Sequence, residues 1–139
     1  MKYWLIKSEP FKYSWNAFLN DNSTYWDGIR NYAARNFLVQ MEVGDQLFFY
    51  HSNEGKEIVG IAEVSRTHYQ DPTTNDEAWV VVDVKPVKSL TYPVPLSTIK
   101  QVENLSQMVL IKNSRLSVQP VLKKEWDIII AISEGKAVK

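Results

Sequence analysis

The tract from residue 25 to 36, YWDGIRNYAARN, holds the residues whose types are best suited to binding a polar ring. It places Trp26 close to Gly28 and surrounds both with hydrogen-bonding side chains. A plain amphipathic helix has no need of so many polar groups among its aromatics. A pocket for a planar, polar ring does need them, because the ring is stacked on its faces and hydrogen-bonded on its edges. On these residues alone two interpretations stay open: Trp26 stacks on a ligand, or Trp26 fills the core.

The polar residues of this tract suggest roles in recognition. Asp27, Asn31 and Asn36 are candidates for reading donors and acceptors, and Arg30 and Arg35 are candidates for contacting phosphates. The structural alternatives are that Asp27 pairs with Arg30, three residues further along, and that Arg35 makes a buried pairing.

Three other tracts share this mixed polar and aromatic character. They are KSEP at 7–10, YHS at 50–52 and RLSVQP at 115–120. Together with 25–36 they predict a binding site assembled from four distant segments of one small domain.

The sequence lacks the common motifs of catalysis and metal binding. His51 and Ser52 are adjacent, so on a strand they point to opposite faces and form no base and nucleophile pair. The histidines, His51 and His68, lack metal-ligand spacing, there is no cysteine, and the five glycines never cluster as in a phosphate loop. We therefore expect no metal and no cofactor.

Composition limits the class of partner. Sixteen basic and sixteen acidic residues cancel, which argues against a general polyelectrolyte binder. Between residues 104 and 124, Lys112, Arg115, Lys123 and Lys124 occur without a carboxylate, either as a solvated face or as the flank of a site. No apolar stretch reaches the length of a membrane span and no signal-peptide layout is present, so we expect a cytoplasmic protein with no membrane partner.

The elements that must position these tracts are strands with interspersed short helices. Aromatic and β-branched runs predict strands at 2–7, 46–52, 58–69 and 79–87, and a strand or extended segment at 115–121. Apolar residues at helical spacing predict helices at 15–19, 32–41, 96–102 and 123–132, while 105–112 is ambiguous between helix and loop. Ser14 and Asn31 are the expected N-caps of the first two helices.

Glycine and proline punctuate the expected strands. Gly60 predicts a bulge or a close approach within the strand at 58–69. Pro86 is expected to end the strand at 79–87, and Pro93 and Pro95 to frame a further break. The absence of regular βαβ alternation favours an α+β domain built on a small, mostly antiparallel barrel or curled sheet. We expect one domain at 1–133 and a short C-terminal tail at 134–139.

In order and spacing, several motifs resemble the EVE-domain family over about residues 2–132. They are KSEP, WDGIRNYAARN, GDQLFFYHS, IVGIAEV, the DP at 71–72 and RLSVQPV. The resemblance implies a PUA-like fold, a curled, mostly antiparallel β-barrel with short peripheral helices. It also implies a reader of modified bases, with modified cytosine or methylated adenine as the ligand.

Carried over by position, the resemblance implies a base-binding pocket drawn from all four tracts. Its residues would be Lys7, Ser8, Glu9, Trp26, Gly28, Asn31, Tyr50, His51, Ser52, Arg115, Leu116 and Ser117. Trp26 would supply the stacking face, and Ser8 and Ser52 the hydrogen bonds to the ring edges. Ala33 departs from the family pattern, which often has glutamine there, so base specificity is expected to differ.

The expected function is a non-catalytic module that holds a flipped-out base of DNA or RNA, presented single-stranded or extruded from a duplex. An enzyme acting on a nucleoside or related amide, as in ASCH relatives, stays an alternative, with Lys7, Glu9 or His51 as acid or base. Carboxylate chemistry stays open too, if Glu9, Asp27 and Asp71 meet. The third alternative is a protein-interaction module.

Overall fold

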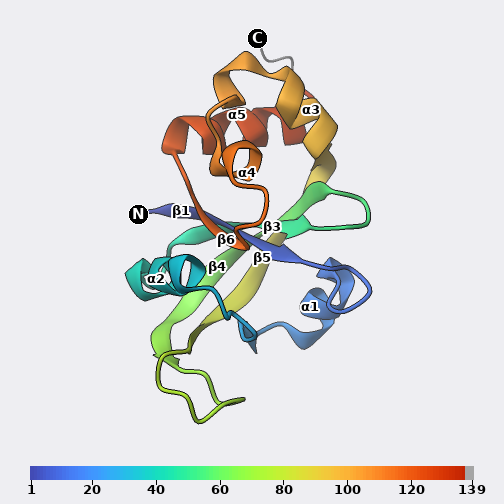
Figure 1. Cartoon of the computed structure of the whole chain (residues 1–139). Coiled ribbons are helices and arrows are strands. Elements are labelled where there is room, and N and C mark those ends of the chain that lie inside the picture. The colour runs from blue at the N-terminus through green and yellow to red at the C-terminus, as the bar shows by residue number, and fades with distance from the viewer. Residues whose placement is uncertain (137–139) are drawn as a thin grey trace.

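The structure is a computed structural model that describes residues 1–136. Its centre is a six-stranded sheet with the strand order β2-β5-β4-β3-β1-β6 (Figure 1). The strands are β1 (Tyr3–Ser8), β2 (Thr24–Tyr25), β3 (Gln46–His51), β4 (Glu57–Gln70), β5 (Val80–Pro95) and β6 (Val118–Val121). The helices are α1 (Trp15–Asp21), α2 (Tyr32–Gln40), α3 (Leu96–Gln101), the 3₁₀ turn η1 (Glu103–Leu105), α4 (Val109–Lys112) and α5 (Lys123–Ser133).

The α+β class is confirmed, and the sheet is mostly antiparallel. Only β1 and β3 pair in parallel among the strands of this sheet, with Lys7 opposite Tyr50 and Ser8 opposite His51. The ladder does not close, because β2 and β6 are its two edges. An open, curled sheet therefore describes the fold better than the expected barrel.

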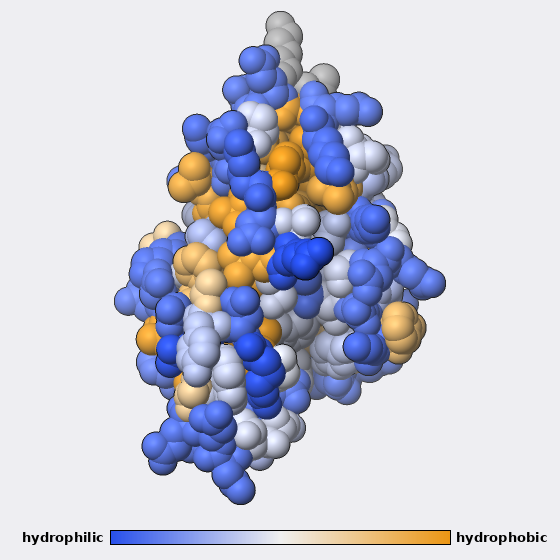
Figure 2. Space-filling view, in the orientation of Figure 1, coloured by the Kyte–Doolittle hydropathy of each residue, from blue (hydrophilic) through white to orange (hydrophobic). Residues whose placement is uncertain are grey.

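The alternation of side chains along the central strands divides the buried residues between the two faces of the sheet. Leu47 and Phe49 of β3 join a cluster that includes residues of α1 and α2. Phe48 and Tyr50 join a second cluster, with residues of α3, α4 and α5. Figure 2 shows apolar side chains gathered near α4 and α5 on this face, whereas the loop between β4 and β5 is hydrophilic.

Both expected N-caps are confirmed. The side chain of Ser14 accepts a hydrogen bond from the Ala17 amide, and that of Asn31 accepts one from the Ala34 amide, each at 3.0 Å. A serine or asparagine there satisfies an amide that has no partner within its own helix. These caps fix where α1 and α2 begin. Trp26 lies in the segment between the two helices.

Gly60 combines the two features expected of it. The register of β4 against β5 shifts between Ile58 and Gly60. A Cβ atom at Gly60 would lie 2.3 Å from the Cζ2 atom of Trp15, so only glycine lets the Trp15 ring of α1 lie directly on the strand.

The expected end of a strand at Pro86 and the expected break at Pro93 are wrong, whereas a break at Pro95 is confirmed. β5 continues through Pro86 and Pro93 and ends at Pro95, which lies opposite Glu57 and directly precedes α3. Proline removes one ladder donor, and strands accommodate that loss at irregularities. Pro86 lies opposite Ala62, at one of the positions where the β4–β5 register shifts.

The remaining segments differ little from expectation. The ambiguous stretch at 105–112 ends in the short helix α4, and the extended segment at 115–121 contains β6. The two-residue strand β2 is not predicted by the sequence, because two residues carry no periodicity. After α5, the amide of Glu134 still donates to the Ile130 carbonyl at 3.1 Å. The rest of the expected tail, 137–139, lies outside the described residues.

Candidate functional site

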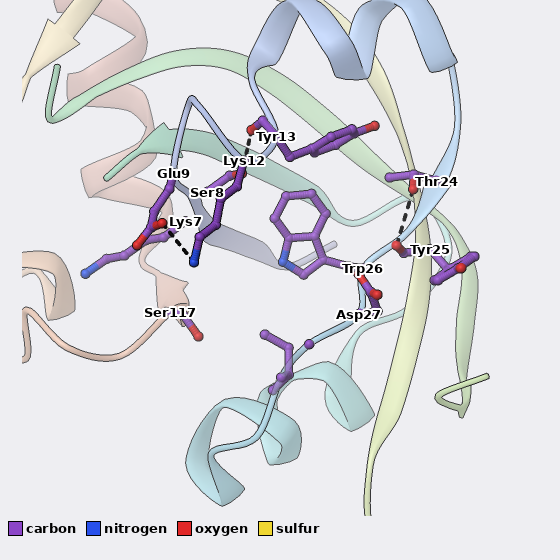
Figure 3. A pocket seen from close by; sticks show the side chains of 12 residues that line it. Lys7, Ser8, Glu9, Lys12, Tyr13, Thr24, Tyr25, Trp26, Asp27 and Ser117 are labelled. Atoms are coloured by element: carbon purple, nitrogen blue, oxygen red, sulfur yellow. Dashed lines mark hydrogen bonds and ion pairs between the residues drawn. The ribbon is translucent and has the colours of Figure 1, made fainter. Parts of the chain in front are cut away.

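A pocket of about 500 Å³ opens between the end of β1, the turn that follows it and the segment from β2 to residue 29 (Figure 3). Its volume falls in the range of small-molecule sites. We call it the Trp26 pocket. Its lining residues are Lys7, Ser8, Glu9, Lys12, Tyr13, Thr24, Tyr25, Trp26, Asp27, Gly28, Ile29 and Ser117.

Trp26 fills the core, one of the two interpretations that the sequence left open, and it also lines the pocket. It is only 7% exposed, and its ring meets Phe49 and Tyr13 edge-on at centroid distances of 5.6 and 6.2 Å. Among the described residues, its indole N–H has no hydrogen-bond partner. Figure 3 shows the indole nitrogen on the side of the ring that faces Lys12 and Ser117. Trp26 is therefore part of the core on one side and presents a free donor to the pocket.

Two local features position Trp26. Its amide donates to the Val82 carbonyl of β5 at 2.8 Å, directly after the short β2–β5 pairing. Two residues later the chain turns at Gly28, which has φ of +78°, a conformation that side chains with a Cβ rarely adopt. The glycine of this tract thus serves to direct the chain around the rim of the pocket.

Tyr13 forms the wall beside Trp26. Its hydroxyl donates to the Asp21 carboxylate at 2.9 Å. Burial, together with this hydrogen bond, raises the pKa of Tyr13 to about 12. Tyr13 is therefore neutral at physiological pH, and it is held in place at both ends because the Ser8 hydroxyl donates to its carbonyl at 2.6 Å.

Glu9 ties the rim of the pocket to a neighbouring loop. One carboxylate oxygen accepts from the Asn53 amide group at 2.6 Å, and the other lies 3.1 Å from the Lys12 ammonium. The Lys12 side chain is 70% exposed. An exposed pair of this kind contributes little to stability, so Lys12 is available to a ligand at the mouth.

Lys7 lies between the Trp26 pocket and a smaller cavity of about 220 Å³ that Tyr50 and Ser52 help to line. Its ammonium donates to the Ser114 carbonyl at 2.6 Å and lies 5.8 Å from the centre of the Tyr50 ring. Burial lowers the pKa of Lys7. Of the expected site residues, Tyr50 and Ser52 therefore belong to the neighbouring cavity rather than to the Trp26 pocket.

His51 lies in neither cavity. Its Nε2 atom accepts a hydrogen bond from the Trp15 amide at 3.0 Å, at the start of α1. Burial lowers the pKa of His51, although the charge of Glu57 opposes the shift. A neutral ring with Nε2 as acceptor fits this contact, so His51 positions α1 and does not reach a ligand in the Trp26 pocket.

Arg30 pairs with Asp71 and not with Asp27, which corrects the structural alternative raised above. Its guanidinium lies 2.9 Å from a carboxylate that is fully buried, and the same carboxylate accepts from the amide and hydroxyl of Thr73. Burial alone would raise the pKa of Asp71, but the hydrogen bonds from Thr73 and Arg30 outweigh it and the pKa is lowered. The Arg30 side chain nevertheless remains 41% exposed.

Four further residues of the expected set do not line the Trp26 pocket. Asn31 is used as the cap of α2, and the Arg35 guanidinium lies over the Tyr32 ring at 5.3 Å. Leu116 is 7% exposed and belongs to the core, and Arg115 is exposed away from the lining. Neighbouring Ser117, however, does line the pocket.

Several lining residues were not predicted. Lys12 and Tyr13 follow KSEP directly, and the turn at 9–12 folds them back onto it, which the Glu9-Pro10 dipeptide could have signalled. Thr24 and Ile29 bracket the tract that contains Trp26 and carry no distinguishing chemistry of their own.

Two kinds of feature are absent from residues 1–136. No group of three or more His, Cys, Asp or Glu side chains is placed to hold a metal ion. No helix in this part of the chain has the length and apolar character needed to cross a membrane.

Comparison with known proteins identifies relatives of this chain. Residues 2–132 match the EVE domain family. Chicken thymocyte nuclear protein 1 is 34% identical over 96% of this chain and 69% of its own length. The crystal structure of a protein from Agrobacterium tumefaciens is 42% identical with a TM-score of 0.95, covering 100% of this chain and 97% of that one. Human THYN1 protein in complex with 5-methylcytosine-containing DNA is 31% identical with a TM-score of 0.89, covering 99% and 100%.

Proposed function

This chain belongs to the EVE domain family, and we propose that it is a non-catalytic nucleic-acid-binding module that holds a flipped-out, modified base in the Trp26 pocket. The observation that carries the proposal is the free indole N–H of Trp26 at a polar pocket large enough for a base. The similarity to human THYN1 in complex with 5-methylcytosine-containing DNA supports the choice of nucleic acid as partner.

The lining of the pocket suits a pyrimidine such as cytosine. An extruded base presents ring acceptors and an exocyclic amine on its edges, and proteins read these by hydrogen bonds and stacking. The Trp26 N–H can donate to a ring acceptor, and the Asp27 carboxylate can accept from an exocyclic amine. Ile29 supplies apolar surface for a methyl group. A methyl group in an apolar pocket is worth about 1–3 kcal/mol, so we expect discrimination of about 10–200-fold.

Phosphates on either side of the base need cations near the mouth of the pocket. Lys12 is exposed at the rim, and among the described residues its ion pair is with the half-buried Glu9. Arg30 and Arg35 stay proposed phosphate contacts. The open part of the Arg30 side chain supports its role, although its charge is already balanced by Asp71.

A second candidate is an enzyme acting on a nucleoside or related amide. It is favoured by Lys7, an amine at the edge of the pocket whose pKa is lowered by burial, because a shift in this direction favours the neutral amine that can act as a base. Incubation of the wild-type protein with modified nucleosides, with chromatography to detect product, distinguishes the reader from the enzyme. A reader leaves the nucleosides unchanged, whereas an enzyme converts them to product.

The test of the reader is titration of Trp26→Phe and wild-type protein with single-stranded oligonucleotides. Each oligonucleotide carries one central cytosine, methylated cytosine, hydroxymethylated cytosine or methylated adenine. Phenylalanine keeps a ring in the core but removes the donor. We expect wild-type protein to prefer one modified base, and Trp26→Phe to bind it about 3- to 10-fold more weakly, the value of one neutral hydrogen bond.

Trp126→Phe is the matched control. Trp126 is also a buried tryptophan, but it stacks on Phe48 at 3.8 Å in the cluster on the other face of the sheet and does not line the Trp26 pocket, so its replacement should leave the affinity unchanged. Equal binding of all four oligonucleotides by the wild type, unaffected by Trp26→Phe, would reject the proposed function.

A further inference from the structure

Phe11 is a large apolar side chain with no place in the core. It is 73% exposed, whereas the neighbouring aromatic Tyr13 is partly buried and packs on the Phe18 and Trp26 rings. Exposing a phenylalanine to water is unfavourable, and a single exposed apolar residue does not by itself indicate function. What distinguishes Phe11 is the backbone that carries it.

Phe11 lies at the tip of a tightly held turn. The amides of Lys12 and Tyr13 both donate to the Glu9 carbonyl, at 3.0 and 2.9 Å. Pro10 precedes Phe11 and fixes its own φ, which favours the turn. The Ser52 amide donates to the Ser8 carbonyl at 2.9 Å, so the base of the turn is also tied to the end of β3.

The turn stands on the rim of the Trp26 pocket. Glu9 and Lys12, on either side of Pro10 and Phe11, line the pocket. In Figure 3 the chain between these two residues bends back on itself beside the Trp26 ring. Phe11 does not itself line the pocket, but its exposed ring is carried by a hydrogen-bonded turn whose flanking residues, Glu9 and Lys12, do.

We propose that Phe11 inserts into duplex DNA at the position from which the pocket has removed its base. This inference rests on the proposed function, because it needs a base in the Trp26 pocket. Extruding a base breaks its stacking on both neighbours and leaves a gap in the duplex. Apolar side chains inserted between base steps stabilise such opened duplexes. Because the backbone of the turn is already ordered by hydrogen bonds, insertion restricts only the Phe11 side chain, and stacking of its ring offsets part of the cost of extrusion.

An inserted side chain can stabilise only nucleic acid whose bases are stacked on both sides of the gap. The test therefore compares a duplex with a single strand. We would measure the affinity of wild type and Phe11→Ala for a duplex and for a single strand, each with one methylated cytosine. We expect Phe11→Ala to bind the duplex about tenfold more weakly or worse, as for loss of one stacked aromatic. Its affinity for the single strand should stay within about twofold of the wild type, because no gap has to be filled there.

A second readout follows extrusion directly. The base next to the methylated cytosine on the same strand is replaced by the fluorescent analogue 2-aminopurine, paired with thymine, whose emission rises when it loses its stacking on the extruded base. We expect wild type to change the emission and Phe11→Ala to change it less at equal occupancy. Tyr92→Ala is the control, since Tyr92 is also an exposed aromatic, at 59%, but does not line the pocket.

Three outcomes would overturn the wedge while leaving the base pocket intact. They are equal loss of affinity for duplex and single strand in Phe11→Ala, no loss for either, and wild-type binding to the single strand only. If wild type binds neither oligonucleotide with any preference for the methylated base, the proposed function fails and the wedge fails with it.

Discussion

At the scale of single residues, the structure brings some of the residues expected in a base-binding pocket together around one cavity and gives others structural contacts elsewhere. Lys7, Ser8, Glu9, Trp26 and Ser117 line the Trp26 pocket as the resemblance implied. His51 belongs to an equally characteristic tract, yet its ring serves the start of α1. The sequence could not reveal this, because the Trp15 amide that donates a hydrogen bond to the His51 ring is 36 residues away along the chain.

The pair of Arg30 with Asp71 leads to a prediction about stability. Asp71→Asn keeps the size of the side chain but removes the charge that accepts from Arg30 and Thr73. Loss of charged hydrogen bonds at a buried acceptor costs about 1–3 kcal/mol. We therefore expect the free energy of unfolding in urea at pH 7 to fall by that amount. Asp127→Asn, which breaks the exposed pair with Lys123, should change it by less than about 0.5 kcal/mol.

The lowered pKa of Asp71 gives the sign of the pH dependence. A carboxyl group whose pKa is lower in the folded state stabilises the fold above its unfolded value, here 3.8. That contribution is lost as the pH falls below 3.8 and through the folded pKa. The difference in stability between wild type and Asp71→Asn should therefore shrink in acid. A difference that stays constant from pH 7 to acid would show that the charge of Asp71 contributes nothing.

At the scale of elements, periodicity predicted the long strands and the helices, and residue type predicted both N-caps. The expectation that proline ends a strand was wrong at Pro86. β5 contains Pro86 and Pro93 and still runs to Pro95. Proline has no backbone N–H to donate to the partner strand, and the register shifts of the β4–β5 ladder accommodate this loss. Such irregularities depend on the partner strand and leave no mark in the local sequence. The same is true of β2, whose two residues pair with β5 and so place Trp26 at the pocket.

The contact of α1 with β4 tests whether Gly60 is required for packing. In Gly60→Ala the new Cβ would meet the six-membered ring of the Trp15 indole, with the nearest atom at 2.3 Å. Overpacking of this kind costs about 1–3 kcal/mol. We expect the midpoint of thermal unfolding to fall and the double variant Gly60→Ala/Trp15→Phe to recover part of the loss, because phenylalanine frees that space. Additive losses in the double variant would contradict a steric origin.

At the scale of the whole molecule, the charges cancel, with sixteen basic and sixteen acidic residues. Affinity for nucleic acid that comes from neutralised phosphates falls with salt in proportion to the number of phosphates contacted. A chain with no net charge supplies no overall excess of cations for many such contacts. The binding that we propose therefore depends on the pocket and on the few cations around it.

This argument predicts a shallow dependence of affinity on salt. With Lys12, Arg30 and Arg35 as the proposed phosphate contacts, three contacts correspond to a slope of log K against log salt of about −2.1 for a single strand and −2.7 for a duplex. Titrations of the wild type between about 50 and 200 mM salt measure it. Lys12→Gln should reduce the slope by about 0.7 on a single strand, without changing the preference for the modified base. Lys123→Gln, in an exposed pair on α5, should leave it unchanged. A wild-type slope steeper than about −5 would mean that many phosphates are bound along an extended surface, and the pocket would then contribute only a minor part of the affinity.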